Sequence, residues 1–460
     1  MTLEPALADA AGPGPIDPDL LRATLAPLAA KHRVPGAQLA VHHAGRTTAV
    51  EVGELEHGAG PSVPRDAAFA IGSVTKAFTA TVAMTLVADE EVELDAPLGE
   101  YLPELDHQDG DATARLTLRQ LLSHTSGLPE GPDSIDVAGS SIRRYVLDHC
   151  RATTVLFPPG TCFSYSNAGY VLVGHLIEVI TGMTWWEATA SILLRPLGVE
   201  PAFLAAPGPP LRPRPTATGH SVNPAVDRVR PVEQSLASAE APCGGLAVSA
   251  VDLVAFGLIH LEGRPAVLPS PYAAQMRAPV PHAEPFGLAD GWGLGLAVFD
   301  DGGDGSLVGV GHDGNANGTA CYLRVAPGAG SVVALTSNAN TGLTMWRELV
   351  GHLRRLGLPV TDSSSGRVLG RPAAAPPGCV GTYRNGDSEY CVTEEDGDVR
   401  LVIDGDLVAR LAFYDGLAFA HEDVTSGERA HAGRFLRDRA TGVVDRIQVG
   451  GRLARRADAP

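Results

Sequence analysis

A helix that is apolar nearly all round constrains the fold of this 460-residue chain more than any other feature. It is the stretch KAFTATVAMTLVAD at residues 76–89, and its composition marks a buried helix rather than a surface one. The chain exceeds the usual domain length of about 100–200 residues. We therefore expect one large domain, which buries this helix, and one smaller domain.

Other elements are expected on both sides of that helix. Asp17-Pro18 supplies an N-cap and a first helical position for a helix that runs toward Lys31, and short apolar runs around Ala44-Gly45 indicate a hairpin. A helix followed by antiparallel strands predicts an α+β domain, whose late strands join the hairpin in one sheet. Apolar runs predict further helices at 116–124, 170–180 and 250–261, and strands at 291–299, 307–312, 319–325 and 331–337.

The last quarter of the chain has the composition of a linker followed by hairpins. The stretch TDSSSGRVLGRPAAAPP has a linker's bias toward Ser, Pro, Ala and Gly. Turn pairs follow at spacings of 8 to 11 residues, which is typical of a small sandwich or barrel; they are Asn385-Gly386, Asp396-Gly397, Asp404-Gly405 and Asp415-Gly416. The predicted parts are a flexible leader at 1–17, a main domain at 18–357, a linker at 358–378 and a small domain at 379–460.

Charge and composition exclude several classes of protein. A formal charge of −18 without a basic stripe argues against nucleic acid as a partner. No apolar run approaches 20 residues, and the N-terminus lacks a basic segment followed by an apolar one, so we expect a cytoplasmic protein without a membrane partner. The six cysteines have no zinc-ligand spacing and are expected as free thiols. Nothing calls for a metal or an organic cofactor.

Ser73-Val74-Thr75-Lys76 lies where the buried helix begins. A spacing of three residues puts a hydroxyl and an amine on one face of a helix, within hydrogen-bonding reach. A lysine in an apolar site is less stable as a cation, and can then accept a serine proton near neutral pH. Helix N-terminal amides can stabilise the oxyanion that forms beside such a serine.

The choice of lysine strengthens this interpretation, because Lys31 and Lys76 are the only lysines among 35 basic residues. Arginine cannot be deprotonated in proteins, whereas lysine can. A lysine kept at this position therefore indicates that a removable proton is needed. The alternative is a surface lysine whose stem lies along the helix.

Two further groups can serve the same reaction. Tyr165-Ser166-Asn167 precedes an apolar helix, so Tyr165 can share the proton transfers and Asn167 can hold a substrate amide; otherwise they are a loop tyrosine and a helix cap. His312-Asp313-Gly314 follows a predicted strand. There Gly314 lets the strand edge approach the substrate, the Asn315 amide can donate to an oxyanion, and His312 can orient the tyrosine or contact a substrate carboxylate. A histidine at a strand end is more often structural.

Together with LTLRQLLSHTSGLP at 116–129, these three ordered motifs resemble the class C β-lactamase-like serine hydrolases over about residues 18–357. The resemblance implies an antiparallel sheet flanked by helices, an all-helical subdomain, an acyl-enzyme on Ser73, and proton transfer by Lys76 and Tyr165. His312 stands where β-lactamases have lysine, which disfavours β-lactam hydrolysis and favours the esterase, peptidase and transacylase branches. APCGGLAVSAVDL also resembles a pocket-lining stretch of the family, so Gly244 and Gly245 either leave room for a substrate side chain or form a tight turn.

Within that family, the start VPGAQLAVHH at 34–43, the missing export signal and the β-rich tail together resemble the penicillin-binding-protein-type thioesterases, which carry a lipocalin-like β-barrel at the C-terminus. Their resemblance implies that Ser73 takes a peptidyl chain with a C-terminal D-residue from a carrier-protein thioester. The peptide's own amine then releases a macrolactam. It also implies that an arginine of the barrel faces the site, where it can bind a peptide carboxylate or carbonyl. Arg452 is the best match, and Arg455 and Arg456 are nearby. The alternative is that these arginines form a solvated basic terminus. The alternatives are a D-stereospecific peptidase or carboxylesterase of the same family, and a non-catalytic binding module.

Overall fold

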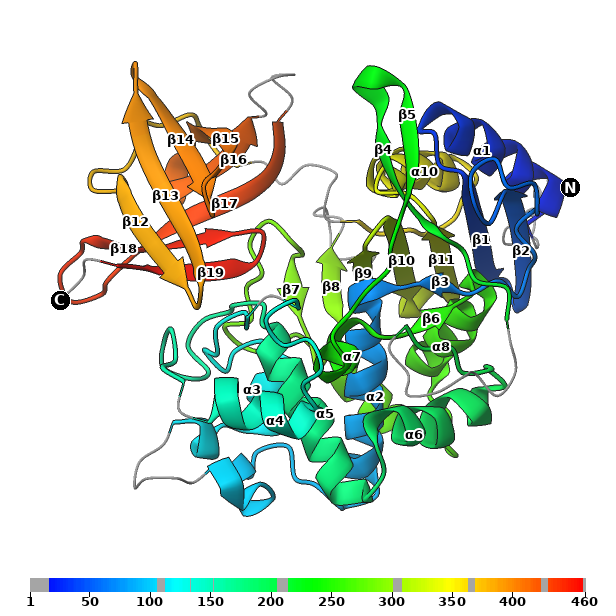
Figure 1. Ribbon diagram of the computed structural model, residues 1–460, viewed down its shortest axis with the longest axis horizontal. Coiled ribbons are helices and arrows are strands. Elements are labelled where there is room, and N and C mark those ends of the chain that lie inside the picture. The colour runs from blue at the N-terminus through cyan, green and yellow to red at the C-terminus, as the bar shows by residue number, and fades with distance from the viewer. Residues whose placement is uncertain are drawn as a thin grey trace, which may run out of the picture.

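The structure, a computed structural model, describes residues 16–105, 112–132, 134–151, 153–204, 214–300, 308–362, 369–422 and 429–457. Residues 1–15 of the predicted leader lie outside the described residues. Figure 1 shows a large body of sheet and helices, with a barrel of orange and red strands beside it. The expected α+β fold with a small C-terminal antiparallel barrel is confirmed.

A seven-stranded antiparallel sheet, in the order β2-β1-β11-β10-β9-β8-β7, forms the centre of the large body. The N-terminal hairpin joins strands from the end of the domain, because β1 pairs with β11. The strands are β1 (Gly36–His43), β2 (Arg46–Gly53), β7 (Gly291–Trp292), β8 (Ala297–Asp300), β9 (Val308–Ala316), β10 (Thr319–Ala326) and β11 (Ser331–Ser337). Shorter pairs are β3 (Phe69–Ala70) with β6 (Ala247–Val248), and β4 (Gly219–Asn223) with β5 (Arg228–Val232).

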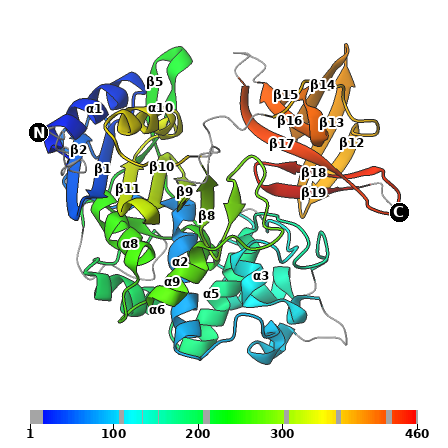
Figure 2. The same cartoon turned by 180° about the vertical axis from the view of Figure 1, so that it is seen from behind.

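Helices cover both faces of this sheet, as the view from behind in Figure 2 shows. On one face lie α1 (Pro18–Lys31) and α10 (Gly342–Arg355), which share a core with β1 and β11. On the other face, α8 (Ala250–Glu262) packs on β10 and β11. The Asp17 side chain caps α1 as expected, accepting a hydrogen bond from Asp19 N at 2.9 Å.

The helical subdomain surrounds α2 (Thr75–Ala88), whose residues 75–86 are all buried. This burial confirms that the apolar stretch forms a buried helix. It also holds the residues that precede α2 between the helical subdomain and the sheet. The other helices are α3 (Leu118–Leu122), α4 (Ile142–Tyr145), α5 (Asn167–Thr181), α6 (Trp185–Ala188), α7 (Ala241–Gly244) and α9 (Ser270–Arg277).

The C-terminal strands form a closed eight-stranded barrel in which β19 pairs back to β12. The four Asx-Gly pairs lie between consecutive strands, and apolar side chains fill the interior. The strands are β12 (Gly381–Asn385), β13 (Ser388–Glu395), β14 (Asp398–Ile403), β15 (Asp406–Phe413), β16 (Ala418–Glu422), β17 (Arg429–Arg437), β18 (Val444–Val449) and β19 (Arg452–Arg456).

The structure corrects the single strand expected at 291–299, which consists of the short strands β7 and β8. Gly295 lies between them with φ +82°, and a Cβ there would lie 2.2 Å from Ala80 Cβ of α2. The chain therefore turns where it meets the buried helix, and only glycine fits that turn.

All six cysteines are free thiols. Over the ranges that the structure describes, no helix has the length and apolarity needed to cross a membrane. The same ranges contain no group of three or more His, Cys, Asp or Glu side chains placed to hold a metal ion.

Candidate active site

Ser73 lies in a short 3₁₀ turn, Gly72–Val74, that leads directly into α2. Strand β9 passes close to this turn. A Cβ on Gly72 would lie 2.2 Å from Asn315 O, and one on Gly314 would lie 1.9 Å from Ile71 O. Both contacts exclude any side chain, so the two glycines bring Ser73 against the β9 segment that carries the third motif.

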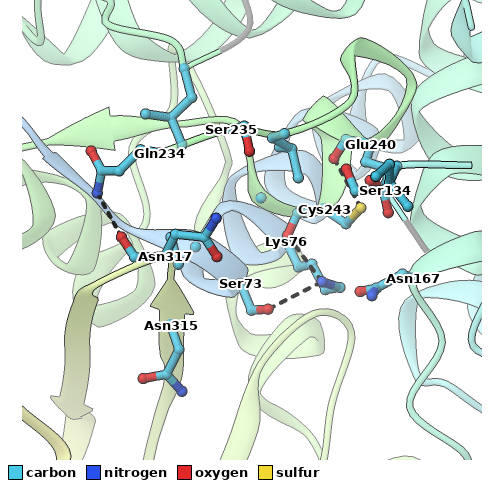
Figure 3. Close-up of a pocket in the computed structure, with 16 residues that line it drawn as sticks. Ser73, Lys76, Ser134, Asn167, Gln234, Ser235, Glu240, Cys243, Asn315 and Asn317 are labelled. Carbon is cyan, nitrogen blue, oxygen red and sulfur yellow. Dashed lines mark hydrogen bonds between the residues drawn. The ribbon is translucent and has the colours of Figure 1, made fainter. Parts of the chain in front are cut away.

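Lys76 is only 1% exposed. Its Nζ donates a hydrogen bond to Cys243 O at 2.9 Å and lies 3.3 Å from Ser73 Oγ (Figure 3). The Nζ also lies 5.0 Å from the centre of the Tyr165 ring. No carboxylate in the described part of the chain forms a salt bridge with Lys76. Lys76 Nζ therefore lies in a buried site within hydrogen-bonding reach of Ser73 Oγ, which is the position that a base for this serine requires.

Tyr165 and Asn167 approach Ser73 from the loop that leads into α5. The Tyr165 hydroxyl is buried and has no hydrogen-bond partner among the described residues. Asn167 is the first residue of α5, and its backbone N–H donates to Glu130 O at 3.1 Å. Ser166 caps the helix by accepting a hydrogen bond from Gly169 N at 3.1 Å. The loop therefore holds both predicted side chains at the site.

His312 is buried in β9, where its Nδ1 lies 2.6 Å from Asp313 O. Burial, assisted by the nearby Lys76 charge, lowers the pKa of His312 to about 3, so the ring is neutral. Because a carbonyl only accepts, Nδ1 carries the proton and Nε2 presents a lone pair. A neutral acceptor favours binding a hydrogen-bond donor over contacting a substrate carboxylate; neither Nε2 nor the Tyr165 hydroxyl has a partner among the described residues.

Arg452 reaches the site from β19 of the barrel. Its guanidinium lies 5.4 Å from the centre of the Tyr165 ring, and Nη2 pairs with Glu130 Oε1 at 2.6 Å. Arg455 is exposed, and Arg456 donates to Val380 O at 2.8 Å. The structure therefore places Arg452, and neither neighbouring arginine, beside the tyrosine.

The barrel also holds the backbone of the tyrosine loop. Tyr165 N donates to Gly451 O at 3.0 Å, and Leu453 N donates to Ser164 Oγ at 3.2 Å. The buried Asn385 side chain accepts from Glu130 N at 2.8 Å and donates to Leu453 O at 3.0 Å. The barrel is thus a wall of the site and not a separate appendage.

Ser73 lies between two cavities. Cavity A, of about 400 Å³, includes Lys76, Ser134, Gln234, Glu240, Gly244 and Asn317 in its wall (Figure 3). Cavity B, of about 350 Å³, includes Tyr165, Trp292, Ala297, Phe299, His312 and Arg452. Ser73, Asn167 and Asn315 line both. A Cβ on Gly244 would make an ordinary contact of 3.6 Å with Leu236, whereas Gly245 is crowded by Ala241; Gly244 is the one that lines the cavity.

His124 had no role assigned from the sequence, although it is the histidine of the HTSGL signature. Its ring stacks on Tyr165 with centroids 4.3 Å apart, and its Nδ1 accepts a hydrogen bond from Ser166 N at 3.1 Å. Burial lowers the pKa of His124 well below its usual value, so the ring is neutral. His124 therefore fixes both the ring of Tyr165 and the backbone next to it.

Replacing His124 with asparagine tests this role. Asparagine accepts the same hydrogen bond and tolerates the φ of +56° at this position, but it removes the stacked ring. Because small misplacements of a reacting group cost up to about 100-fold in rate, we expect kcat to fall by about that factor with a smaller change in KM. Steady-state kinetics on an ester substrate, with the Tm as a folding control, measure both. An unchanged kcat would contradict the assignment.

Comparisons with known proteins identify the family. The family model described as Beta-lactamase matches residues 21–354. Penicillin-binding protein 4 of Amycolatopsis lactamdurans is 35% identical over 345 residues, which cover 72% of this chain and 89% of that protein.

Solved structures extend the match to 95% of this chain. The crystal structure of SurE is 38% identical, covers 95% of this chain and 98% of that one, and has a TM-score of 0.84; SurE with D-Leu is similar at a TM-score of 0.82. A D-stereospecific amidohydrolase from a Streptomyces species is 25% identical over 75% of this chain and all of that one, with a TM-score of 0.59. The resemblance drawn from the motifs is confirmed: the chain belongs to the beta-lactamase family, as a penicillin-binding-protein-like serine hydrolase or acyltransferase.

Proposed function

We propose that this enzyme releases a peptide from its carrier-protein thioester through an acyl-enzyme on Ser73, and that the peptide's own amine then closes a macrolactam. The observation that carries the proposal is the position of Ser73 between two cavities. A hydrolase needs room for an acyl chain and a water, whereas a cyclase needs room for two ends of a peptide. The two cavities supply that room on either side of the nucleophile.

The first half of the reaction makes the acyl-enzyme. Lys76 Nζ accepts the proton of Ser73 Oγ, and the oxygen attacks the thioester carbonyl. The backbone amides of Ser73 and Asn315, brought together by the close approach of β9 to the serine turn, are the donors proposed for the oxyanion. The C–S bond then breaks, and the carrier thiolate leaves with a proton returned through Lys76 or Tyr165.

The second half replaces the thiol with an amine. The nitrogen attacks the ester carbonyl, gives up one proton to the Tyr165 and Lys76 pair, and forms the amide as Ser73 Oγ leaves and regains its proton. Of the proposed substrate-binding residues, the Asn167 side chain holds the substrate amide, and Gly244 leaves space for the side chain of the acyl residue. The SurE structure with D-Leu supports a D-residue at that position.

The second candidate function is a D-stereospecific peptidase or carboxylesterase, in which water attacks the same acyl-enzyme. Similarity to the D-stereospecific amidohydrolase favours it. That match, however, covers all of the amidohydrolase and only 75% of this chain. In this chain, Gly450 and Arg452 of the barrel form part of the wall of cavity B. The barrel therefore adds a surface beyond what the shared hydrolase fold provides.

The test is a linear peptide with a C-terminal D-residue, activated as a short pantetheine-like thioester, with products weighed by mass spectrometry. A product lighter than the free acid by one water, absent with Ser73→Ala, supports cyclisation. Linear acid alone, formed faster than with Ser73→Ala, contradicts the cyclase and supports the hydrolase. If a fluorophosphonate probe labels neither the wild type nor Ser73→Ala, the chain is instead a non-catalytic binding module.

A further inference from the structure

The two cavities differ in the proton-transfer group that they contain. Lys76 lines cavity A and Tyr165 lines cavity B, while Ser73 faces both. An attacking amine must lose a proton to a group within reach of its nitrogen. It also approaches the acyl carbon along the path by which the thiol left. Gly244, which leaves space for the side chain of the acyl residue, lines cavity A. We therefore assign the acyl residue to cavity A, and the departing thiol and the arriving amine to cavity B.

Cavity B is surrounded by buried polar atoms that have no hydrogen-bond partner among the described residues. They are Tyr165 Oη, His312 Nε2, Trp292 Nε1 and Arg452 Nε. Each such atom costs about 1–3 kcal/mol when left unpaired, and a grouping of four around one cavity points to a ligand that pairs with them. Nε2 of the neutral His312 accepts a hydrogen bond, and Trp292 Nε1 donates one. An amine followed by a peptide carbonyl offers both complements.

The charged side chains of cavity B are already compensated within the protein. Arg452 pairs with Glu130, and Asp313 pairs with the buried Arg324. A charged ligand side chain would have to compete with these ion pairs. The remaining wall is apolar and includes Leu288, Trp292, Ala297 and Phe299. The cavity therefore suits a neutral amine that carries an apolar side chain.

We propose that cavity B is the acceptor site, which binds the free amino end of the peptide. The parts that it binds are the α-amine, the carbonyl and the apolar side chain of the first residue. The proposal rests on the function proposed above and goes beyond it, because it assigns the second substrate end and its chemical class. The amine nitrogen gives its proton to Tyr165 Oη as that hydroxyl passes its own proton, through Lys76, to Ser73 Oγ, and the C–N bond forms as the ester bond to Ser73 Oγ breaks.

The experiment separates acylation from amine transfer. The donor is an N-blocked D-leucyl thioester, which cannot cyclise, and the added acceptors are L-phenylalanine amide, glycine amide and L-aspartic acid amide. Thiol release reports acylation, and mass spectrometry gives the ratio of amide product to acid. We expect the wild type to prefer L-phenylalanine amide by at least about tenfold, a typical value for burying one apolar side chain.

Variants of the two cavities give opposite results if the assignment holds. Ala297→Leu, which fills cavity B, lowers the ratio of amide to acid formed with L-phenylalanine amide by about tenfold or more. This ratio is set after the thiol has left, so it reports the acceptor whatever the variant does to thiol release. Gly244→Val, in cavity A, lowers thiol release. Leu288→Ala changes the preference among acceptors, whereas the matched change at Leu407, which is 45% exposed on the barrel, changes nothing.

Two outcomes would overturn the inference and differ from a failure of the proposed function. Thiol release with no preference among the three acceptors contradicts the acceptor site while leaving the acyl-enzyme intact. So does a preference that Ala297→Leu and Leu288→Ala leave unchanged. Absence of thiol release from wild type, in contrast, contradicts the thioester function itself. Because thiol release is measured on each variant, a misfolded variant is recognised, and Leu288→Ala at the rim then replaces Ala297→Leu as the test.

Discussion

Replacing Lys76 with arginine is expected to stop the acylation of Ser73 although the positive charge remains. Arginine cannot give up its proton in a protein, so it cannot act as the base. A positioned general base contributes about 10²–10⁴-fold to such a step, and we expect a loss in that range. The measurement is the rate of fluorophosphonate labelling and of thiol release from a thioester.

The chain supplies its own matched control, since Lys31 is the only other lysine. Its side chain is 60% exposed and pairs with Glu348. Lys31→Arg keeps this surface ion pair and is expected to leave acylation unchanged. The guanidinium is larger than the amine and can disturb the buried site through its size. Lys76→Met, whose side chain is unbranched and of similar length, therefore measures the effect of losing the base without that added size. Labelling of either Lys76 variant at close to the wild-type rate would rule out Lys76 as the base.

The sequence was sufficient for features that depend on neighbours in the chain. The spacing of Ser73 and Lys76 places them on one helical face, whatever surrounds that helix. The same holds for the Asx-Gly turns, since Asp396, Asp404 and the glycines after them have the positive φ values that such turns require. The order of three motifs then identified the family, and the spacing of the turn pairs predicted a small sandwich or barrel at the C-terminus.

Features that depend on packing between distant segments escaped sequence reasoning. The stack of His124 on Tyr165 and the ion pair of Arg452 with Glu130 join residues from different elements, and no local pattern announces either. Even the neutral state of His312 follows from its burial, which a strand-end histidine does not reveal. The roles given to the site residues therefore remain predictions that the kinetic experiments test.

The third motif rests on a buried charge network that the sequence also did not indicate. Arg324 of β10 is 2% exposed and pairs with Asp313 of the motif and with Asp362, which follows α10. Its guanidinium also lies 4.0 Å from the centre of the Phe299 ring in the wall of cavity B. Arg324 thus connects the segment beyond α10 to the strand beside the nucleophile.

Replacing Arg324 with methionine is expected to destabilise the protein by about 3–5 kcal/mol, because it removes the guanidinium that compensates the buried Asp313 carboxylate. Burial already raises the pKa of Asp313 against the opposing effect of Arg324, and the variant raises it further. A carboxyl whose folded-state pKa lies above its unfolded value destabilises the fold at higher pH, and this penalty shrinks as the pH falls through the folded-state pKa. The loss should therefore be largest near neutral pH and become smaller as the pH falls through the raised pKa of Asp313.

Urea unfolding of Arg324→Met at several pH values measures this loss. Arg384→Met is the matched control, because Arg384 makes an exposed ion pair with Glu389 and is expected to cost at most about 1 kcal/mol. Asp313→Asn in the Arg324→Met background removes the buried charge that Arg324 compensated and should reduce the pH dependence of the loss. A loss that is independent of pH would instead assign the role of Arg324 to packing against Phe299 and its neighbours. The ionic link between the third motif and the segment beyond α10 would then be ruled out as the stabilising element.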